Sequence, residues 1–287
     1  MKKIDSIKTS LIITVYNRVH LLRKSLISLS KQSILPDELI ISDDGSDEDI
    51  ISGINDIVEK LDFPIKYVSQ PNRGFRLSKV RNNGVRISAG ELLIFLDQDI
   101  IYTKDFLMTF VENMREGLFL TAYPIRLDET QSRMISESVI SDYDFLRYIK
   151  HFQINKIRKQ YLKDLFSYLG AKIGVVQQKP KLRGGVCAIN RKDYFLVNGY
   201  DEMFQGWGNE DDDIRKRLYN AGVKGFNPFI KDFPLHLYHE LFHKNGLRVN
   251  QSYVDSKKQI LKSGYFKCEY GIMNPLIEDE IKIKVLK

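Results

Sequence analysis

Short apolar runs alternate with helical patterns along the first 130 residues of the chain. The apolar runs end in turn residues and predict strands over residues 11–16, 38–42, 65–68 and 91–96. The segments between them predict helices over residues 18–31, 49–61 and 78–88. Strands and helices that alternate at this spacing indicate right-handed crossovers and an α/β fold with a mostly parallel sheet.

Residues 128–180 break this alternation. The stretch is basic and aromatic, permits helices and contains no run with the period of a strand. We therefore expect a helical excursion from the sheet. After it, the pattern predicts a strand over residues 186–190 and a helix over residues 213–221, which Gly222 would end.

The composition is that of a globular protein. Of 287 residues, 43% are hydrophobic and 28% charged, and the chain is long enough to bury a sizeable core. No apolar run approaches the roughly 18 residues of a membrane-spanning helix, and the short apolar run near the N-terminus is not that of a signal peptide. Two cysteines cannot form a disulfide framework, so a reducing cytoplasm is expected.

Positive charge is concentrated in one part of the chain. The formal net charge is +7, but residues 147–183 alone hold ten Lys and Arg against a single acid, Asp164. Such a surface could bind nucleic acid, anionic lipid or an acidic substrate. It could equally be the solvated face of a helix, and composition alone leaves these interpretations open.

Polar residues follow three of the predicted strands. These residues are Tyr16-Asn17-Arg18, Asp43-Asp44 and Asp97-Gln98-Asp99. Ligands of such sheets bind at the carboxyl ends of the strands, so these side chains should converge on one edge. Asp97 and Asp99 would there bind Mg²⁺ or Mn²⁺ bridged to phosphate oxygens, although Asp-X-Asp also occurs in solvated turns. Asp43 and Asp44 would either stop the strand locally or accept hydrogen bonds from a base or a ribose.

The densest acidic cluster covers residues 206–213, where four acids follow the only tryptophan, Trp207. Acids at a helix N-terminus are stabilised by the helix dipole, which is the simplest explanation. A cap needs only one or two acids, however, and crowded carboxylates raise one another's pKa, which suits a general base. An indole beside carboxylates is also a common way to hold a sugar. We therefore favour a functional cluster, in which Asp213 serves only the helix.

Two further groups of side chains could carry chemistry. His239, Glu240 and His243 fit the H-E-x-x-H signature of zinc proteases. Pro234 and Gly246 leave room for only a very short helix, so a single histidine as metal ligand fits better. The cations Arg73, Arg76, Lys79 and Arg81 would either neutralise a diphosphate at the same sheet edge or lie on a solvated helix.

Taken together, these segments resemble a known family. SLIITVYNR, ELIISDDGSDED and QPNRGFRLSKVRNNGVRISAGELLIFLDQD are similar to the nucleotide-binding half of family 2 glycosyltransferases, which have the GT-A fold. RGGVCAINRKDYFLVNGYDEMFQGWGNEDDDIRKRL resembles the acceptor segment of β-1,4-galactosyltransferases and of chondroitin-polymerase-type enzymes. The resemblance implies a Rossmann-like GT-A domain with a nucleotide-sugar half (1–127), a basic helical insertion (128–180), an acceptor and catalytic half (181–250) and a C-terminal helix and tail (251–287).

The resemblance also implies a role for each matching residue. Asp211 would be the catalytic base, with Glu210 binding acceptor hydroxyls. The nucleotide and donor would contact Tyr16, Asn17, Arg18, Asp43, Asp44, Arg81 and Asp97. The acceptor would contact Trp207, Gly184 and Gly185. Asp99 and His239 would bind Mn²⁺ or Mg²⁺, with His236 as the alternative histidine.

The implied reaction is an inverting, metal-dependent transfer of a hexose or N-acetylhexosamine from a UDP-sugar to a glycan or lipid-linked glycan in surface polysaccharide synthesis. Asn209 and Gln98 depart from the family pattern without removing a proposed catalytic group. Leu182 replaces a bulkier aromatic, which favours UDP-GalNAc and UDP-Gal as donors, while UDP-GlcA stays open.

We expect a cytoplasmic protein that binds no nucleic acid, with peripheral contact at the inner face of the membrane through residues 147–183 left open. The alternatives are a nucleic-acid or membrane-binding protein that uses this basic stretch, and a zinc protease.

Overall fold

A computed structural model describes residues 7–175, 179–240 and 250–287. The strands are β1 (Thr9–Val15), β2 (Glu38–Asp43), β3 (Ile65–Ser69), β4 (Leu92–Asp97), β5 (Ile100–Tyr102), β6 (Leu118–Thr121), β7 (Ile125–Arg126), β8 (Val186–Asn190), β9 (Lys224–Phe226), β10 (Pro234–His236) and β11 (Lys282–Val285). The helices are α1 (Val19–Ser30), α2 (Ile50–Val58), α3 (Leu77–Ile87), α4 (Phe106–Asn113), α5 (Glu129–Met134), α6 (Glu137–Ser141), the 3-10 helix η1 (Phe145–Tyr148), α7 (His151–Lys172), α8 (Arg191–Leu196), α9 (Glu210–Asn220) and α10 (Gln251–Lys262). None of the helices in these ranges is long and apolar enough to cross a membrane.

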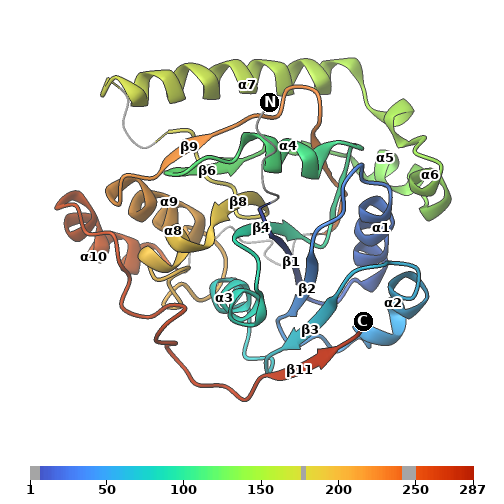
Figure 1. Ribbon diagram of the computed structural model, residues 1–287, viewed down its shortest axis with the longest axis horizontal. Helices are drawn as coiled ribbons and strands as arrows, with labels where there is room; N and C mark the ends of the chain where they lie inside the picture. The colour runs from blue at the N-terminus through green and yellow to red at the C-terminus, as the bar shows by residue number, and fades with distance from the viewer. Residues whose placement is uncertain (1–6, 176–178, 241–249) are drawn as a thin grey trace.

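The centre of the molecule is a sheet of eight strands in the order β11–β3–β2–β1–β4–β8–β6–β9 (Figure 1). Strands β3, β2, β1 and β4 pair in parallel, and β8 joins β4 antiparallel. The predicted α/β architecture with a mostly parallel sheet is therefore confirmed. The predicted strands and helices of the first 100 residues match the observed elements to within a few residues at each end.

Helices cover both faces of the sheet, α1 and α2 on one side and α3, α8 and α9 on the other (Figure 1). Successive residues of β1 point to opposite faces, so Leu11 and Ile13 belong to the core beneath α1 and α2, whereas Ile12 belongs to the core beneath α3, α8 and α9. All three side chains are fully buried. Burial on both faces explains why these strands read as continuous apolar runs.

The expected helical excursion is present as α5, α6, η1 and α7. Its inner side chains share a third core with the small sheet β5–β10–β7, which lies beside the carboxyl end of β4. The long helix α7 runs along the outer edge of the molecule (Figure 1) and contacts β9 and β7. The excursion is thus attached to the edge strand of the main sheet at one end and to the small sheet at the other.

The C-terminal tail ends in β11, which adds an antiparallel edge strand beside β3. On its way there, the tail places the carboxylate of Asp279 2.5 Å from Arg76 Nη1 and within 3.6 Å of Lys79 Nζ. Arg76 and Lys79 are both buried. These two cations therefore neutralise protein carboxylates, and the expectation that they face a diphosphate or solvent is wrong for both of them.

Candidate active site

The ends of β1 and β4 meet through side chains at the carboxyl edge of the sheet. Thr14 Oγ1 donates a 3.0 Å hydrogen bond to Asp97 Oδ1. Gln98 Oε1 accepts a hydrogen bond from the Tyr16 N–H at 3.1 Å, and Gln98 Nε2 donates to the Tyr16 carbonyl at 3.3 Å. Gln98, which departs from the family pattern, therefore ties β4 to β1 and turns its neighbours Asp97 and Asp99 toward other groups.

The loops after β1 and β2 are joined by Asn17 and Arg18, which both adopt left-handed backbone angles (φ 51° and 56°). Asn17 Oδ1 accepts from the Asp47 N–H at 2.8 Å, and the Arg18 N–H donates to Glu48 at 2.8 Å. Arg18 Nη2 also donates to the Glu240 carbonyl at 2.8 Å. Both predicted residues lie at the expected edge, where they bring the β1 and β2 loops and the segment after β10 together.

Asp43 and Asp44, at the end of β2, are buried and bound by protein groups. Asp43 Oδ2 accepts from Tyr67 Oη at 2.5 Å. Asp44 accepts from Gln70 Nε2 at 2.6 Å and from the Arg76 N–H at 2.9 Å. Burial raises the pKa of Asp44 to about 6 despite these donors. Both carboxylates thus shape the wall at the end of β2, and both have protein partners.

A cluster of metal-ligating side chains forms beside Asp99. Antiparallel pairing of β5 with β10 puts His236 opposite Ile100, and the Leu237 N–H donates to the Asp99 carbonyl at 2.9 Å. His239 Nε2 lies 2.9 Å and His236 Nε2 3.6 Å from Asp99 Oδ2. One ligand atom from each of the three residues lies within 4.8 Å of the others. Both candidate histidines, rather than one of them, are therefore in reach of a shared ion.

The chemistry of this cluster fits a divalent cation. Asp99 is buried, and its Oδ1 has no hydrogen-bond partner within the described parts of the chain. Burial alone would raise the pKa of Asp99, but the His239 hydrogen bond and the charge of His236 keep it below its ordinary value, so the carboxylate is ionised. Imidazole ligands favour a transition metal over Mg²⁺, which prefers oxygen ligands.

Asp211 lies in the first turn of α9, and donors orient both of its carboxylate oxygens. Oδ2 accepts from the Gly184 N–H at 2.9 Å, and Oδ1 accepts from Arg81 Nη1 at 3.0 Å and Tyr200 Oη at 3.3 Å. Its side chain is 32% exposed. Asp211 is thus fixed in direction while one side stays open to a ligand.

Arg81 joins Asp97 to Asp211. Its side chain is 1% exposed, and its Nη2 lies 3.4 Å from Asp97 Oδ1 while Nη1 reaches Asp211. The guanidinium also stacks on the Tyr200 ring at 4.8 Å. The carboxylates that follow β4 and those that begin α9 therefore belong to a single ion-pair network.

Glu210, next to Asp211, has an unusual environment. Its Oε2 is buried and, among the described residues, has no hydrogen-bond partner. Burial, reinforced by the charge of Asp211, raises the pKa of Glu210 to about 7, while Arg81 acts in the opposite direction. A buried carboxyl with an unused oxygen is suited to accept or donate one hydrogen bond to a ligand.

Gly184 and Gly185 leave space that the acidic side chains occupy. A Cβ at Gly184 would lie 2.0 Å from Asp211 Oδ1, and a Cβ at Gly185 would lie 2.2 Å from Asp97 Oδ2. Any larger residue would displace one of these carboxylates. The two glycines are therefore required by the network on both sides of them.

Trp207 and Asp213 have different environments. Trp207 is 54% exposed in the loop before α9, where it is available to a ligand. Asp213 is buried and lies 2.7 Å from Arg217 Nε and 2.5 Å from Lys257 Nζ. Lys257 also binds Asp201 at 2.6 Å. Asp213 thus anchors α9 to α10 by ion pairs, which differs from the expected role at the helix dipole.

Two residues of the site, Arg183 and Tyr200, were not predicted from the sequence. Arg183 precedes Gly184, stacks on the Tyr123 ring at 4.7 Å and lies 4.0 Å from Asp164 of α7. Its Nη1 is buried and has no hydrogen-bond partner among the described residues. The position of Arg183 beside the paired glycines was the available signal. Leu182, by contrast, is 3% exposed and packs in the core beneath α9.

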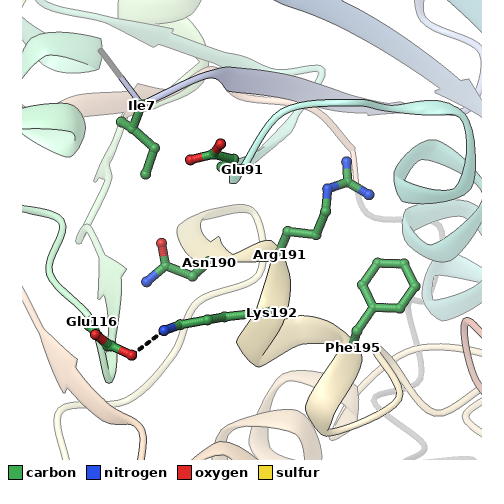
Figure 2. Close-up of a pocket in the computed structure, with 7 residues that line it drawn as sticks. All are labelled: Ile7, Glu91, Glu116, Asn190, Arg191, Lys192 and Phe195. Carbon is green, nitrogen blue, oxygen red and sulfur yellow. Dashed lines mark hydrogen bonds and ion pairs between the residues drawn. The ribbon is translucent and has the colours of Figure 1, made fainter. Parts of the chain in front are cut away.

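One cavity lies away from this cluster. It measures about 640 Å³ and is lined by Ile7, Glu91, Glu116, Asn190, Arg191, Lys192 and Phe195 (Figure 2). Glu91 immediately precedes β4, so the cavity lies at the opposite end of that strand from Asp97. Lys192 pairs with Glu116, and Arg191 donates to the Gly90 carbonyl at 2.6 Å. Because these charges are already satisfied, the carboxyl edge remains the candidate site.

The zinc-protease interpretation required a helix over H-E-x-x-H. His239 and Glu240 follow β10 in a segment without helical structure, and His243 lies outside the described residues. His239 instead points to Asp99, which is not part of that signature.

Two family models match the chain. The model for glycosyl transferase family 2 matches residues 10–175. The model for the N-terminal domain of galactosyltransferase matches residues 166–240. The first covers more than half of the chain, and the two overlap over residues 166–175, at the end of α7.

Among curated relatives, the chondroitin synthase of Escherichia coli is 27% identical over 229 residues, which is 74% of this chain and 32% of that protein. The chain spans between 23% and 52% of the length of the first curated relatives that it matches. Among solved structures, GalNAc-T7 with UDP, GalNAc and Mn²⁺ has a TM-score of 0.59 at 15% identity and covers 89% of this chain and 50% of its own. A Drosophila β-1,4-galactosyltransferase 7 mutant with manganese, UDP-Gal and xylobiose has a TM-score of 0.52 at 13% identity, and the match covers 93% of this chain and 84% of the other. These structures share the GT-A fold with the chain.

Proposed function

Because the chain belongs to glycosyltransferase family 2, we propose that it is an inverting, metal-dependent transferase that moves a hexose or N-acetylhexosamine from a UDP-sugar to a glycan or glycolipid. The observation that carries the proposal is the network around Arg81. It joins Asp97, on the predicted donor side, to Asp211, on the predicted acceptor side, at 3.4 and 3.0 Å. An inverting transfer needs the base held close to the bound donor, in a fixed direction.

The donor would lie along the ends of β1, β2 and β4. Asp43 and Asp44 would line the uracil and ribose pocket, with Tyr16, Asn17 and Arg18 at its rim and Asp97 toward the sugar. Arg81 would act mainly by holding Asp97 and Asp211, since its side chain is almost fully buried. UDP-GalNAc or UDP-Gal remain the favoured donors, in line with the sugars named in GalNAc-T7 and the Drosophila enzyme. The buried position of Leu182 adds no support for either sugar.

Asp99, His236 and His239 would hold the metal. Mn²⁺ is favoured over Mg²⁺ because two of the three candidate ligands are imidazoles. When bound, the ion would offset the charge that develops on the departing diphosphate. The preorganised ionised carboxylate of Asp99 supplies the negative charge that holds it.

Asp211 would remove the proton from the acceptor hydroxyl as that oxygen attacks the anomeric carbon. The bond from the anomeric carbon to the diphosphate oxygen breaks at the same time, and the configuration at the carbon inverts. The Gly184 N–H and the Tyr200 hydroxyl hold the Asp211 carboxylate in a fixed direction, which lowers the cost of aligning the base with the hydroxyl.

The acceptor would contact Trp207, Gly184, Gly185 and Glu210. The exposed indole would stack on a sugar face, and the unpartnered Glu210 oxygen would bond an acceptor hydroxyl. The match to a chondroitin synthase favours a growing polysaccharide as acceptor. Helices α5, α6 and α7 would lie beside the site without taking part in the chemistry, and Asp164 near Arg183 would be their point of contact with it.

A panel of UDP-GalNAc, UDP-Gal, UDP-GlcA and UDP-glucose tests the proposal. UDP release and thermal stabilisation would be measured with Mn²⁺, with Mg²⁺ and with chelator. We expect stabilisation by UDP only with the metal and turnover of one donor above the others. No metal-dependent binding of any UDP-sugar would refute the proposed donor class.

A further inference from the structure

Helix α7 presents an apolar stripe to solvent. Leu162, Phe166, Leu169 and Ile173 are 50%, 71%, 47% and 77% exposed. Their spacing of four, three and four residues puts them on one face of the helix. Large exposed apolar side chains that form a contiguous row indicate an interaction surface more often than isolated ones do.

The stripe is not needed to attach α7 to the rest of the fold. The opposite face of the helix does this, with Ile157 in the third core and Tyr168 packed 4.9 Å from the ring of Phe226. Asp164 also faces inward and accepts from Asn227 Nδ2 at 2.8 Å. The helix is therefore held by one face and leaves the other for a different contact.

Cations flank the stripe. Lys156, Arg158, Lys159 and Lys163 are all exposed. At 100° per residue, Lys156, Lys159 and Lys163 follow one side of the stripe and Arg158 the other. In the described parts of the chain, no carboxylate lies within 4.0 Å of these four cations, whereas the only acid of α7, Asp164, is buried. The outer face of α7 thus combines apolar and purely positive groups.

We propose that the outer face of α7 docks on a membrane surface containing anionic lipids, with the stripe inserted at the boundary of headgroups and acyl chains. Apolar side chains bordered by Lys and Arg have the chemistry of a helix that lies in this plane. Two copies of the chain paired through α7 would bring like charges together. A nucleic acid would satisfy the cations but leave the stripe in water.

Docking through α7 has a consequence for the acceptor. Asp164, on the inner face of the same helix, lies beside Arg183, which precedes Gly184 of the candidate site. The bilayer would therefore lie on the acceptor side of the cleft, within reach of a lipid-linked glycan. This consequence rests on the proposed function, whereas membrane docking itself does not.

Flotation of the full chain with vesicles tests the proposal. Phosphatidylcholine vesicles would be compared with vesicles that also contain phosphatidylglycerol. The variant Phe166→Ser/Leu169→Ser should bind the anionic vesicles about tenfold or more weakly, because it removes much of the inserted apolar surface. The matched control Leu35→Ser/Ile260→Ser changes two side chains that are 45% and 49% exposed elsewhere and should bind like the parent chain.

Charge reversal tests whether the cations of α7 cause the preference for anionic lipid. Lys159→Glu/Lys163→Glu should lose the preference for anionic vesicles, while Lys60→Glu/Lys258→Glu should keep it. The Phe166→Ser/Leu169→Ser variant should retain metal-dependent UDP-sugar hydrolysis without vesicles, so failure of docking and failure of the proposed function are distinguishable.

Four results would overturn the proposal. The first is absence of binding to anionic vesicles, and the second is equal loss in the control variants. The third is an oligomer of the parent chain, detected by light scattering, that dissociates in Phe166→Ser/Leu169→Ser, while the parent chain does not bind vesicles. That outcome would assign the stripe to a second copy of the chain. Tight RNA binding by the parent chain, lost on Lys159→Glu/Lys163→Glu but unchanged by Phe166→Ser/Leu169→Ser, would also count against it.

Discussion

Replacing Gly184 by alanine should move the proposed base without changing its chemistry. The added Cβ would lie 2.0 Å from Asp211 Oδ1 and 2.4 Å from Arg81 Nη1, whereas ordinary contacts of a Cβ begin near 3.4 Å. Because Arg81 is buried, the partly exposed Asp211 carboxylate is the group that can retreat, by more than about 1 Å. A displacement of this size costs about a hundredfold in rate, or about 2.7 kcal/mol of activation free energy.

The assay is UDP release at saturating donor and metal, with UDP affinity measured on the same protein. We expect Gly184→Ala to lower kcat about a hundredfold and to weaken UDP binding less than Gly185→Ala does. Gly185→Ala is the matched control, because its Cβ would meet Asp97 Oδ2 at 2.2 Å and disturb the donor side. That variant should weaken donor binding as well. A folded Gly184→Ala protein with kcat within a few-fold of the parent would refute the assignment of Asp211 as base.

Three further predictions follow from the side chains around the site and beneath it. Since the pKa of Glu210 is raised to about 7, its carboxyl is protonated below that pH, so kcat/KM for the acceptor should rise with pH through about 7 and Glu210→Gln should remove this rise. In manganese titrations, His239→Asn should weaken metal binding by at least about tenfold and His236→Asn by less, because their Nε2 atoms lie 2.9 and 3.6 Å from Asp99 Oδ2. Unchanged manganese affinity in both variants would exclude the cluster as a metal site. Lys257→Met removes the buried cation that pairs with both Asp201 and Asp213, and leaves Asp213 with Arg217 alone. It should lower the free energy of unfolding in urea by about 3–5 kcal/mol, against little change for the exposed Lys258→Met.

The first half of the fold could be predicted from the sequence because of how its strands are buried. Strands β1, β2 and β4 lie inside the sheet with both faces covered, so each appears as an uninterrupted apolar run. Strand β11 escaped prediction because it is a short edge strand, Lys282–Val285, with every residue exposed and lysines in alternation. Exposed lysines are typical of sheet edges and carry no apolar signal.

The candidate site was predictable residue by residue only in part. Lys79 and Arg81 look equivalent in the sequence, yet two residues of helix turn side chains about 200° apart. Lys79 therefore meets Asp279 of the tail, whereas Arg81 enters the network with Asp97. The partner of each cation depends on long-range packing, which local patterns do not encode.

The metal cluster illustrates the same limit. Asp99 followed an apolar strand and could be located from that pattern. The joint approach of both histidines depends on the pairing of β5 with β10, which are separated by more than 130 residues. Sequence resemblance had suggested one histidine with the other as an alternative, and only the register of this pairing brings His236 and His239 to the same carboxylate.

One comparison tests the central claim most directly: UDP release by Asp211→Asn against Asp212→Asn, in the presence of manganese, the preferred donor and an acceptor. Asp212 is the neighbouring acid in the same helical turn, 42% exposed and paired with Arg215. We expect Asp211→Asn to lower kcat by about a hundredfold to ten-thousandfold with UDP binding intact, and Asp212→Asn to behave like the parent. Equal turnover in the two variants would contradict it.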